Sequence, residues 1–288
     1  MTTRRTSWPY LYIAITLGLT WSYTAYLLGD PANRLDMFVF AMLIPGLVAI
    51  ILCALQYRSV KRLVEPIVGR FQLPIYLFSV WYPLAFIGAC GLISWLSQLA
   101  RLDGERLGTL ASLPGPIELT IGLVLLFGEE YGWRGYLLPE LRRQHGLMAA
   151  VMTTGIVWAL FHAPMVYALA AFSGTGNPIL VCGVQMAAVF TFSFPFAYIF
   201  LMTGSIIPPI IFHLVWNIYN PIVLGSIYRN ESGIINGNIL LINGEAIMGV
   251  LLGLVFVLWF VRNRSGIAKQ IEMPAHCFES PELTEELS

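Results

Sequence analysis

The sequence predicts an all-α polytopic membrane protein, with about eight transmembrane helices enclosing a polar cavity inside the membrane. Of its 288 residues, 57% are hydrophobic and only 11% are charged, whereas a soluble domain usually carries about 25% charged residues. The apolar residues form runs of about twenty residues, which suit helices crossing a roughly 30 Å hydrocarbon core and are too long for barrel strands. A soluble protein could not bury so many such runs.

Hydropathy divides the apolar residues into eight segments, of which the fourth and the seventh are interrupted by polar residues. The predicted spans are residues 8–28, 36–56, 74–100, 115–138, 147–171, 179–202, 208–227 and 245–262. They predict a single transmembrane helical domain over residues 1–270. Residues 271–288 are rich in glutamate and poor in apolar residues, which predicts a disordered cytoplasmic tail.

The arginines and lysines predict which ends of the helices face the cytoplasm. One side of the predicted bundle carries Arg4, Arg5, Arg58, Lys61, Arg62, Arg70, Arg142, Arg143, Arg262, Arg264 and Lys269. The other side carries Arg34, Arg101, Arg106 and Arg229. Because basic loops stay in the cytoplasm, we expect a multi-pass protein of the cell membrane with both termini cytoplasmic, which agrees with an even number of spans.

Two adjacent acids, Glu129 and Glu130, lie inside the fourth predicted span. An ionised side chain at this depth costs roughly 2.5–3.5 kcal/mol, so such residues are candidates for a functional site. Arg134 follows Glu130 by four residues and lies on the same helix face, where it can neutralise that carboxylate. Glu129 points about 100° away and has no basic residue at either helical neighbour. One acid is therefore explained as a structural ion pair and the other is not.

Two histidines also lie within apolar spans. His162 follows Trp158 by four residues in the fifth span, and His213 precedes Asn217 by four residues in the seventh. A single histidine in an apolar helix is more often a packing residue bonded to a carbonyl, but two of them together with an unpaired Glu129 favour an active site. His213 and Asn217 share a helix face and can donate to one developing oxyanion.

These motifs, Glu129-Glu130-x-x-x-Arg134, Trp158-x-x-x-His162 and His213-x-x-x-Asn217, resemble those of the CAAX protease and bacteriocin-processing family of intramembrane endopeptidases, type II CAAX prenyl endopeptidases in particular. The resemblance covers about residues 112–225. One departure is Trp158, where the family usually has phenylalanine.

The resemblance implies hydrolysis of a peptide bond within the membrane, at a cavity open to the cytosol. Glu129 and His162 would activate a water molecule, His213 and Asn217 would stabilise the oxyanion, and Glu130 with Arg134 would support the site. The implied partners are membrane lipid and a peptide or protein substrate, prenylated or not. Nucleic acid is not expected, because 16 basic residues balance 16 acidic ones.

A zinc ion is the open question at this site. Glu129, His162 and His213 together with a water molecule would complete a tetrahedral zinc site, as in metalloproteases. The H-E-x-x-H signature is absent, and Asn217 is a poor zinc ligand. The residues therefore favour a glutamate-activated water molecule without an obligatory metal and without another cofactor.

Two other classes of function use the same residues. A proton-coupled transporter could employ Glu129 and the histidines as a relay, although the internal repeats common in carriers are not found. A non-catalytic membrane scaffold could retain the fold, although every polar residue of the three motifs is present.

Overall fold

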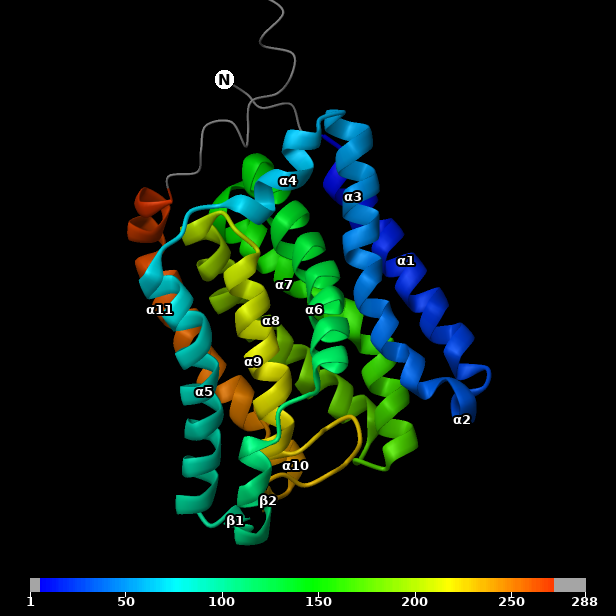
Figure 1. The fold of residues 1–288 in the computed structure, drawn as a ribbon, viewed down its shortest axis with the longest axis vertical. Coiled ribbons are helices and arrows are strands. Elements are labelled where there is room, and N and C mark those ends of the chain that lie inside the picture. Colours follow the sequence, from blue (N-terminus) through cyan, green and yellow to red (C-terminus); the bar gives the residue numbers. More distant parts are fainter. Residues whose placement is uncertain (1–5, 272–288) are drawn as a thin grey trace, which may run out of the picture.

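Long apolar helices run side by side along one direction, in the arrangement expected of a polytopic membrane protein (Figure 1). The computed structural model of the protein describes residues 6–271, so Arg4, Arg5 and the predicted tail from residue 272 onwards lie outside the described residues. The long helices are α1 (Trp8–Leu28), α3 (Leu43–Tyr57), α5 (Leu73–Leu96), α6 (Pro116–Glu130), α7 (Leu138–Ser173), α8 (Pro178–Thr203), α9 (Ile207–Leu224) and α11 (Ile247–Gln270).

Shorter elements join the long helices at the two ends of the bundle. They are α2 (Pro31–Arg34), η1 (Leu35–Met42), α4 (Val60–Val68), β1 (Ala100–Leu102), η2 (Gly104–Ala111), η3 (Tyr131–Leu137), β2 (Ile235–Gly237) and α10 (Ile239–Ile242). The strands β1 and β2 pair antiparallel, with Arg101 opposite Asn236. Figure 1 places α4 at one end of the bundle and α2, β1, β2 and α10 at the other end.

The described residues contain seven helices long and apolar enough to cross a membrane, so the predicted count of eight is not confirmed. The difference arises in one continuous element of 58 residues, Pro116–Ser173, which holds both the fourth and the fifth predicted spans. At Gly146 its backbone leaves the helical conformation, with φ 79° and ψ 177°. Glycine adopts such a positive φ readily because it has no Cβ.

Contacts on the two sides of Gly146 show that the chain reverses direction there. Before it, Gly128 lies against Gly46 and Tyr136 bonds to Gln56, so this part runs parallel to α3. After it, side-chain hydrogen bonds join residue 145 to residue 10 and residue 160 to residue 21, so this part runs parallel to α1. The helices α1 and α3 are antiparallel, because residue 12 bonds to residue 45 and residue 23 to residue 37.

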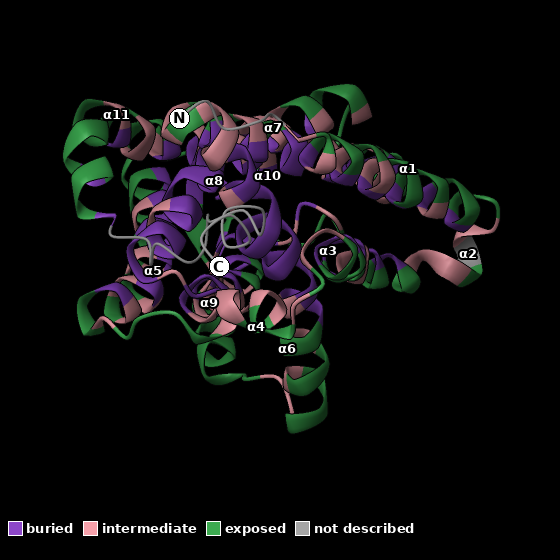
Figure 2. Cartoon of the chain, turned by 90° about the horizontal axis from the view of Figure 1, so that it is seen from above, coloured by how far each residue is buried: buried purple, intermediate pink, exposed green. Residues whose placement is uncertain are grey.

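Helix α8 forms the centre of the bundle, and 56% of the residues in its most apolar stretch are buried, against 28% for α1. Figure 2 shows the buried residues in the middle of the bundle and the exposed ones on its periphery. Many peripheral side chains are large and apolar, including Leu55, Trp81 and Val255. A surface of this kind is stable against lipid and would aggregate in water.

A close approach between α6 and the start of α3 positions the glutamates, and we expect Gly128→Leu to disrupt it. A Cβ at Gly128 would lie 2.8 Å from the carbonyl oxygen of Met42 and 3.0 Å from Cα of Leu43. The variant should lose about 1–3 kcal/mol of stability through overpacking, measured by thermal unfolding in detergent. Gly122→Leu is the matched control, because a Cβ at Gly122 meets nothing within 4 Å. Equal stability of the two variants would contradict this packing.

Candidate active site

Glu129 and Glu130 lie at the end of α6, where the helix continues as the seven-residue π-helix η3. Such wider turns occur in short stretches and frequently mark functional sites. Every residue of η3 is buried, as are both glutamates. The sequence correctly predicts a helix here, but its π geometry has no signal in the apolar pattern.

The predicted ion pair between Glu130 and Arg134 is present and fully buried. Arg134 Nη1 lies 3.0 Å from Glu130 Oε1 and 3.1 Å from Oε2, and the two side chains are 1% and 0% exposed. The Arg134 guanidinium also stacks on two aromatic rings, with its central carbon 4.0 Å from the centroid of Trp158 and 4.3 Å from that of Phe196. Cation–π contacts of this kind stabilise a desolvated guanidinium. Trp158 therefore supports the site by packing on Arg134.

His213 on α9 lies between the two glutamates, which corrects the expectation that Glu129 has no partner. Its Nδ1 is 2.9 Å from Glu130 Oε1, so Nδ1–H donates to a carboxylate that also accepts from Arg134. Its Nε2 is 3.7 Å from Glu129 Oε2, beyond direct hydrogen-bond length. Glu130 therefore orients the His213 ring as well as pairing with Arg134. Sequence spacing could not show this contact, because the two residues lie 83 positions apart.

His162 on α7 is held by its own helix. Its Nδ1 lies 2.8 Å from the carbonyl oxygen of Trp158. A carbonyl only accepts, so Nδ1 carries the proton, and Nε2 of the neutral ring carries a lone pair. The bond to a backbone carbonyl is the one expected for a packing histidine. It also fixes the tautomer that a general base requires.

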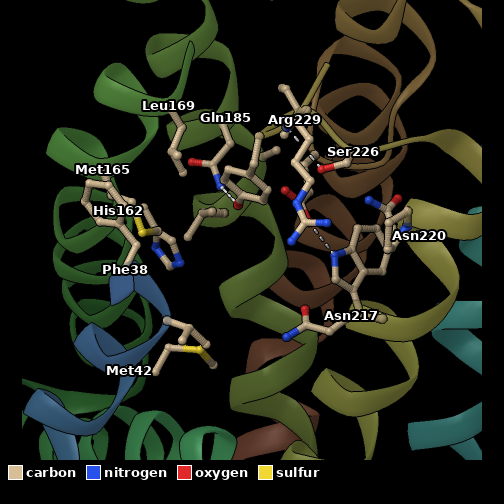
Figure 3. Close-up of a pocket in the computed structure, with 18 of the residues that line it drawn as sticks. Phe38, Met42, His162, Met165, Leu169, Gln185, Asn217, Asn220, Ser226 and Arg229 are labelled. Atoms are coloured by element: carbon tan, nitrogen blue, oxygen red, sulfur yellow. Dashed lines mark hydrogen bonds between the residues drawn. The ribbon is translucent and has the colours of Figure 1, made fainter. Parts of the chain in front are cut away.

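The four residues predicted to be catalytic, Glu129, His162, His213 and Asn217, line one cavity of about 1150 Å³. His162 and Asn217 extend into it from opposite sides, α7 and α9 (Figure 3). Asn217 is exposed to the cavity. The residues predicted to be supporting, Glu130 and Arg134, are buried behind the wall and do not line the cavity. The structure thus assembles the predicted set from three separate spans.

The donor set predicted for zinc is not found as a cluster within residues 6–271. The group there with metal-ligand geometry is Glu129, Glu130 and His213, whose ligand atoms lie within 4.8 Å of one another, and it does not include His162. Glu130 in this group already binds both Arg134 and His213. A zinc ion at that point would lie next to the Arg134 guanidinium, where two cations repel each other. The residues do not fit a zinc centre, and a metalloprotease is not supported.

A second group of polar residues lines the cavity and was missed by the sequence analysis. Gln185 Nε2 donates to the Tyr228 hydroxyl at 2.9 Å, and Trp216 Nε1 donates to Glu245 Oε1 at 3.0 Å. Gln185 and Asn220 are 1% and 3% exposed, and both line the cavity. Two sequence features could have indicated this group: Gln185 is a polar residue inside an apolar span, and Glu245 is an acid at the start of another span.

The lining of the cavity extends to the end of the bundle that holds α2 and α10. There it includes Asp36 on η1, Ser173 at the end of α7 and Arg229 in the loop after α9. Those basic residues predicted to be cytoplasmic that fall within residues 6–271 lie on α4 and at the helix ends near it, at the other end of the bundle (Figure 1).

Comparison with known proteins agrees with the motifs. Residues 113–219 match a family described as Rce1-like, type II CAAX prenyl endopeptidase Rce1-like. This range is close to the predicted core of about 112–225, and it contains Glu129, His162, His213 and Asn217. No curated protein matches the chain. The part of the chain that carries the candidate site is therefore similar to the Rce1-like type II CAAX prenyl endopeptidases, in agreement with the resemblance carried by the three motifs.

Proposed function

We propose that this protein is an intramembrane endopeptidase that hydrolyses a peptide bond of membrane-associated substrates with water activated by Glu129 and His162. One observation carries the proposal: Glu129, His162, His213 and Asn217, which come from three different spans, line a single cavity. The match of residues 113–219 to a family of CAAX endopeptidases supports the same chemistry.

Glu129 and His162 act on the water molecule. The Glu129 carboxylate and Nε2 of His162 are the two proton acceptors beside the water molecule, of which one takes its proton, and a positioned general base accelerates hydrolysis by about 10²–10⁴-fold. The water oxygen attacks the peptide carbonyl carbon as its proton passes to the base. When the C–N bond breaks, the same proton passes to the leaving amine. Neither residue is consumed.

His213 and Asn217 stabilise the negative charge that develops on the carbonyl oxygen. The Asn217 amide is exposed to the cavity and supplies N–H donors. Nδ1–H of His213 is engaged by Glu130, so its donor to the oxyanion is Nε2–H, which is present when the ring carries both protons. Glu130 fixes the ring for this role.

The cavity walls support a substrate with an apolar part. Phe38, Met165, Leu169 and Phe172 line the cavity together with the polar groups, and pockets of this mixed kind bind ligands mainly through apolar contact. A prenylated CAAX peptide offers an apolar chain beside the scissile peptide bond, so it is the substrate class to test.

Purified protein in detergent should cleave a quenched CAAX peptide, and mass spectrometry should show two products whose masses sum to the peptide plus one water molecule. The matched substrate is the same peptide without the prenyl group, which we expect to be cleaved more slowly because it loses apolar contact. Retention of the two peptides intact by folded protein would contradict the proposal.

A zinc chelator should leave this cleavage unchanged. The expectation follows from the site geometry, because Glu130 in the candidate metal group is already bound to Arg134 and His213. The rate is measured before and after prolonged dialysis against chelator. Loss of activity that returns on adding zinc would show instead that the site needs a metal.

A further inference from the structure

The described basic residues are distributed unequally between the two ends of the bundle. Around α4 and the neighbouring helix ends lie Arg58, Lys61, Arg62, Arg70, Arg142, Arg143, Arg262, Arg264 and Lys269. The acids described there are Glu65 and Glu140, which pair with two of these arginines. The end that holds α2, β1 and α10 carries four arginines, two of which pair with aspartates. The end with α4, called here the basic end, therefore has a net positive charge within residues 6–271.

Helix α4 connects two membrane spans and lies where both of them end. The span before it ends at Tyr57 and the span after it begins at Leu73. Figure 1 shows α4 at that end of the bundle, inclined to the long helices. With nine residues and a rise of about 1.5 Å per residue, α4 is too short to cross a hydrocarbon core of roughly 30 Å. It therefore lies at the level where the acyl chains of the membrane meet the lipid headgroups.

One face of α4 packs on the elements that carry the candidate site. Leu63 packs against the core, and its carbonyl oxygen accepts a hydrogen bond of 2.9 Å from the Tyr131 hydroxyl of η3. The backbone N–H of Ile206, in the turn between α8 and α9, donates to the carbonyl oxygen of Pro66 at 2.8 Å. The position of α4 is thus linked to η3 and to the start of α9, which hold the arginine and the histidine bound to Glu130.

The second face of α4 is apolar and exposed, and the third face is charged. Val60, Val64 and Val68 fall within about 80° of one another around the helix, and they are 76%, 43% and 71% exposed. Beside them the charged face carries Lys61 and the ion pair of Arg62 with Glu65. An apolar face next to a face with lysine and arginine is typical of helices that lie in the plane of a membrane interface.

We propose that α4 binds anionic phospholipid at the membrane surface, with its three exposed valines among the acyl chains and with Arg58 and Lys61 against the phosphate groups. Both basic side chains are exposed, and anionic headgroups attract such residues beside a span. A second copy of the chain docked on this face would bring like charges together, so a lipid is the occupant that fits. The proposal goes beyond the proposed function and requires no cleavage.

Lipid-dependent stability tests the charged part of this surface. The unfolding midpoint of the full chain in detergent is measured with added phosphatidylglycerol or with phosphatidylcholine of the same acyl chains. Phosphatidylglycerol should raise the midpoint further, by about 2–4 °C for each basic residue that it binds. Arg58→Gln combined with Lys61→Gln should remove this difference between the two lipids. Because each variant is compared with itself in the two lipids, an altered stability of the variant does not affect the result.

The matched control removes two exposed arginines from the opposite end of the bundle. Arg101→Gln combined with Arg229→Gln takes away the same charge but should keep the full difference between phosphatidylglycerol and phosphatidylcholine. Equal stabilisation of the wild type by the two lipids would overturn the proposal. An equal loss in the two double variants would overturn it as well, because the effect would then depend on net charge and not on α4.

Fluorescence tests whether the apolar face lies among the acyl chains. A single cysteine is introduced by Val64→Cys or by Lys61→Cys and labelled with an NBD fluorophore, in a chain whose native cysteines are replaced by alanine. In vesicles with phosphatidylglycerol, the probe on Val64→Cys should emit at shorter wavelength and be quenched more by nitroxides on the acyl chains. Equal, water-like emission from the two positions would overturn the proposal. Shielding on Val64→Cys that requires high protein concentration would show a second copy on this face and would overturn it too.

Discussion

His162→Gln is expected to lower kcat by about 10²–10⁴-fold, the contribution of a positioned general base. The bond from His162 Nδ1 to the Trp158 carbonyl fixes the tautomer whose Nε2 can accept a proton. Glutamine retains similar volume and polarity but cannot take up a proton near neutral pH, so KM should change much less than kcat. Steady-state cleavage of the quenched peptide by the purified variant measures both constants.

His145→Gln is the matched control, because His145 lies on the same helix but outside the cavity. It bonds to Tyr10 near the basic end, and the variant should retain nearly full activity. If the two variants had equal activity, His162 would be the packing histidine that its backbone hydrogen bond also allows, and the base would be Glu129 alone.

Arg134→Met is expected to destabilise the protein by about 3–5 kcal/mol, the usual cost of removing one partner from a buried ion pair. Methionine can retain the apolar contact with Trp158 and Phe196, but Glu130 keeps a buried charge whose principal partner is gone. The change in unfolding free energy is measured by thermal or denaturant unfolding in detergent.

Two further variants separate the charge effect from packing. Glu130→Gln combined with Arg134→Met removes both charges, so the double variant should be more stable than the sum of the single losses predicts. Arg106→Met breaks the pair with Asp103, whose side chains are 51% and 30% exposed, and should cost roughly 0–1 kcal/mol. Losses of equal size for Arg134→Met and Arg106→Met would mean that burial of the first pair has no energetic consequence.

The sequence predicts well those features of the site that depend on local helix geometry. The pairing of Glu130 with Arg134 follows from their four-residue spacing, and the structure has it. The shared face of His213 and Asn217 follows in the same way, and both residues line the cavity. Polar residues in apolar spans are costly, so they stand out without knowledge of the tertiary structure.

Contacts between distant helices are where the sequence analysis fails. It leaves Glu129 without a partner, yet His213 Nε2 lies 3.7 Å away. The sequence also leaves open a zinc site made of His162, Glu129 and His213, whereas the cluster with metal-ligand distances includes Glu130 in place of His162. Helix tilt and the π turn after Glu130 decide these distances, and hydropathy contains no information on either.

The predicted count of eight spans is not confirmed, for a different reason. The apolar pattern separates residues 115–138 from 147–171, and the structure has a reversal at Gly146 between them. Because only one residue there departs from helical dihedrals, the two spans form one continuous element, Pro116–Ser173. Hydropathy detects membrane crossings, whereas hydrogen bonding defines helices, so the two counts differ.

The most direct test of the account compares two isosteric changes of a carboxylate in the same cavity, Glu129→Gln and Glu245→Gln. Both glutamates line the cavity, but Glu129 Oε2 lies 3.7 Å from His213 Nε2, whereas Glu245 accepts a hydrogen bond from Trp216. The cleavage rate of the quenched peptide should fall by about 10²–10⁴-fold for Glu129→Gln and stay within a few-fold of wild type for Glu245→Gln. Retained activity in Glu129→Gln, with the protein folded, would contradict the claim that this glutamate activates the water molecule.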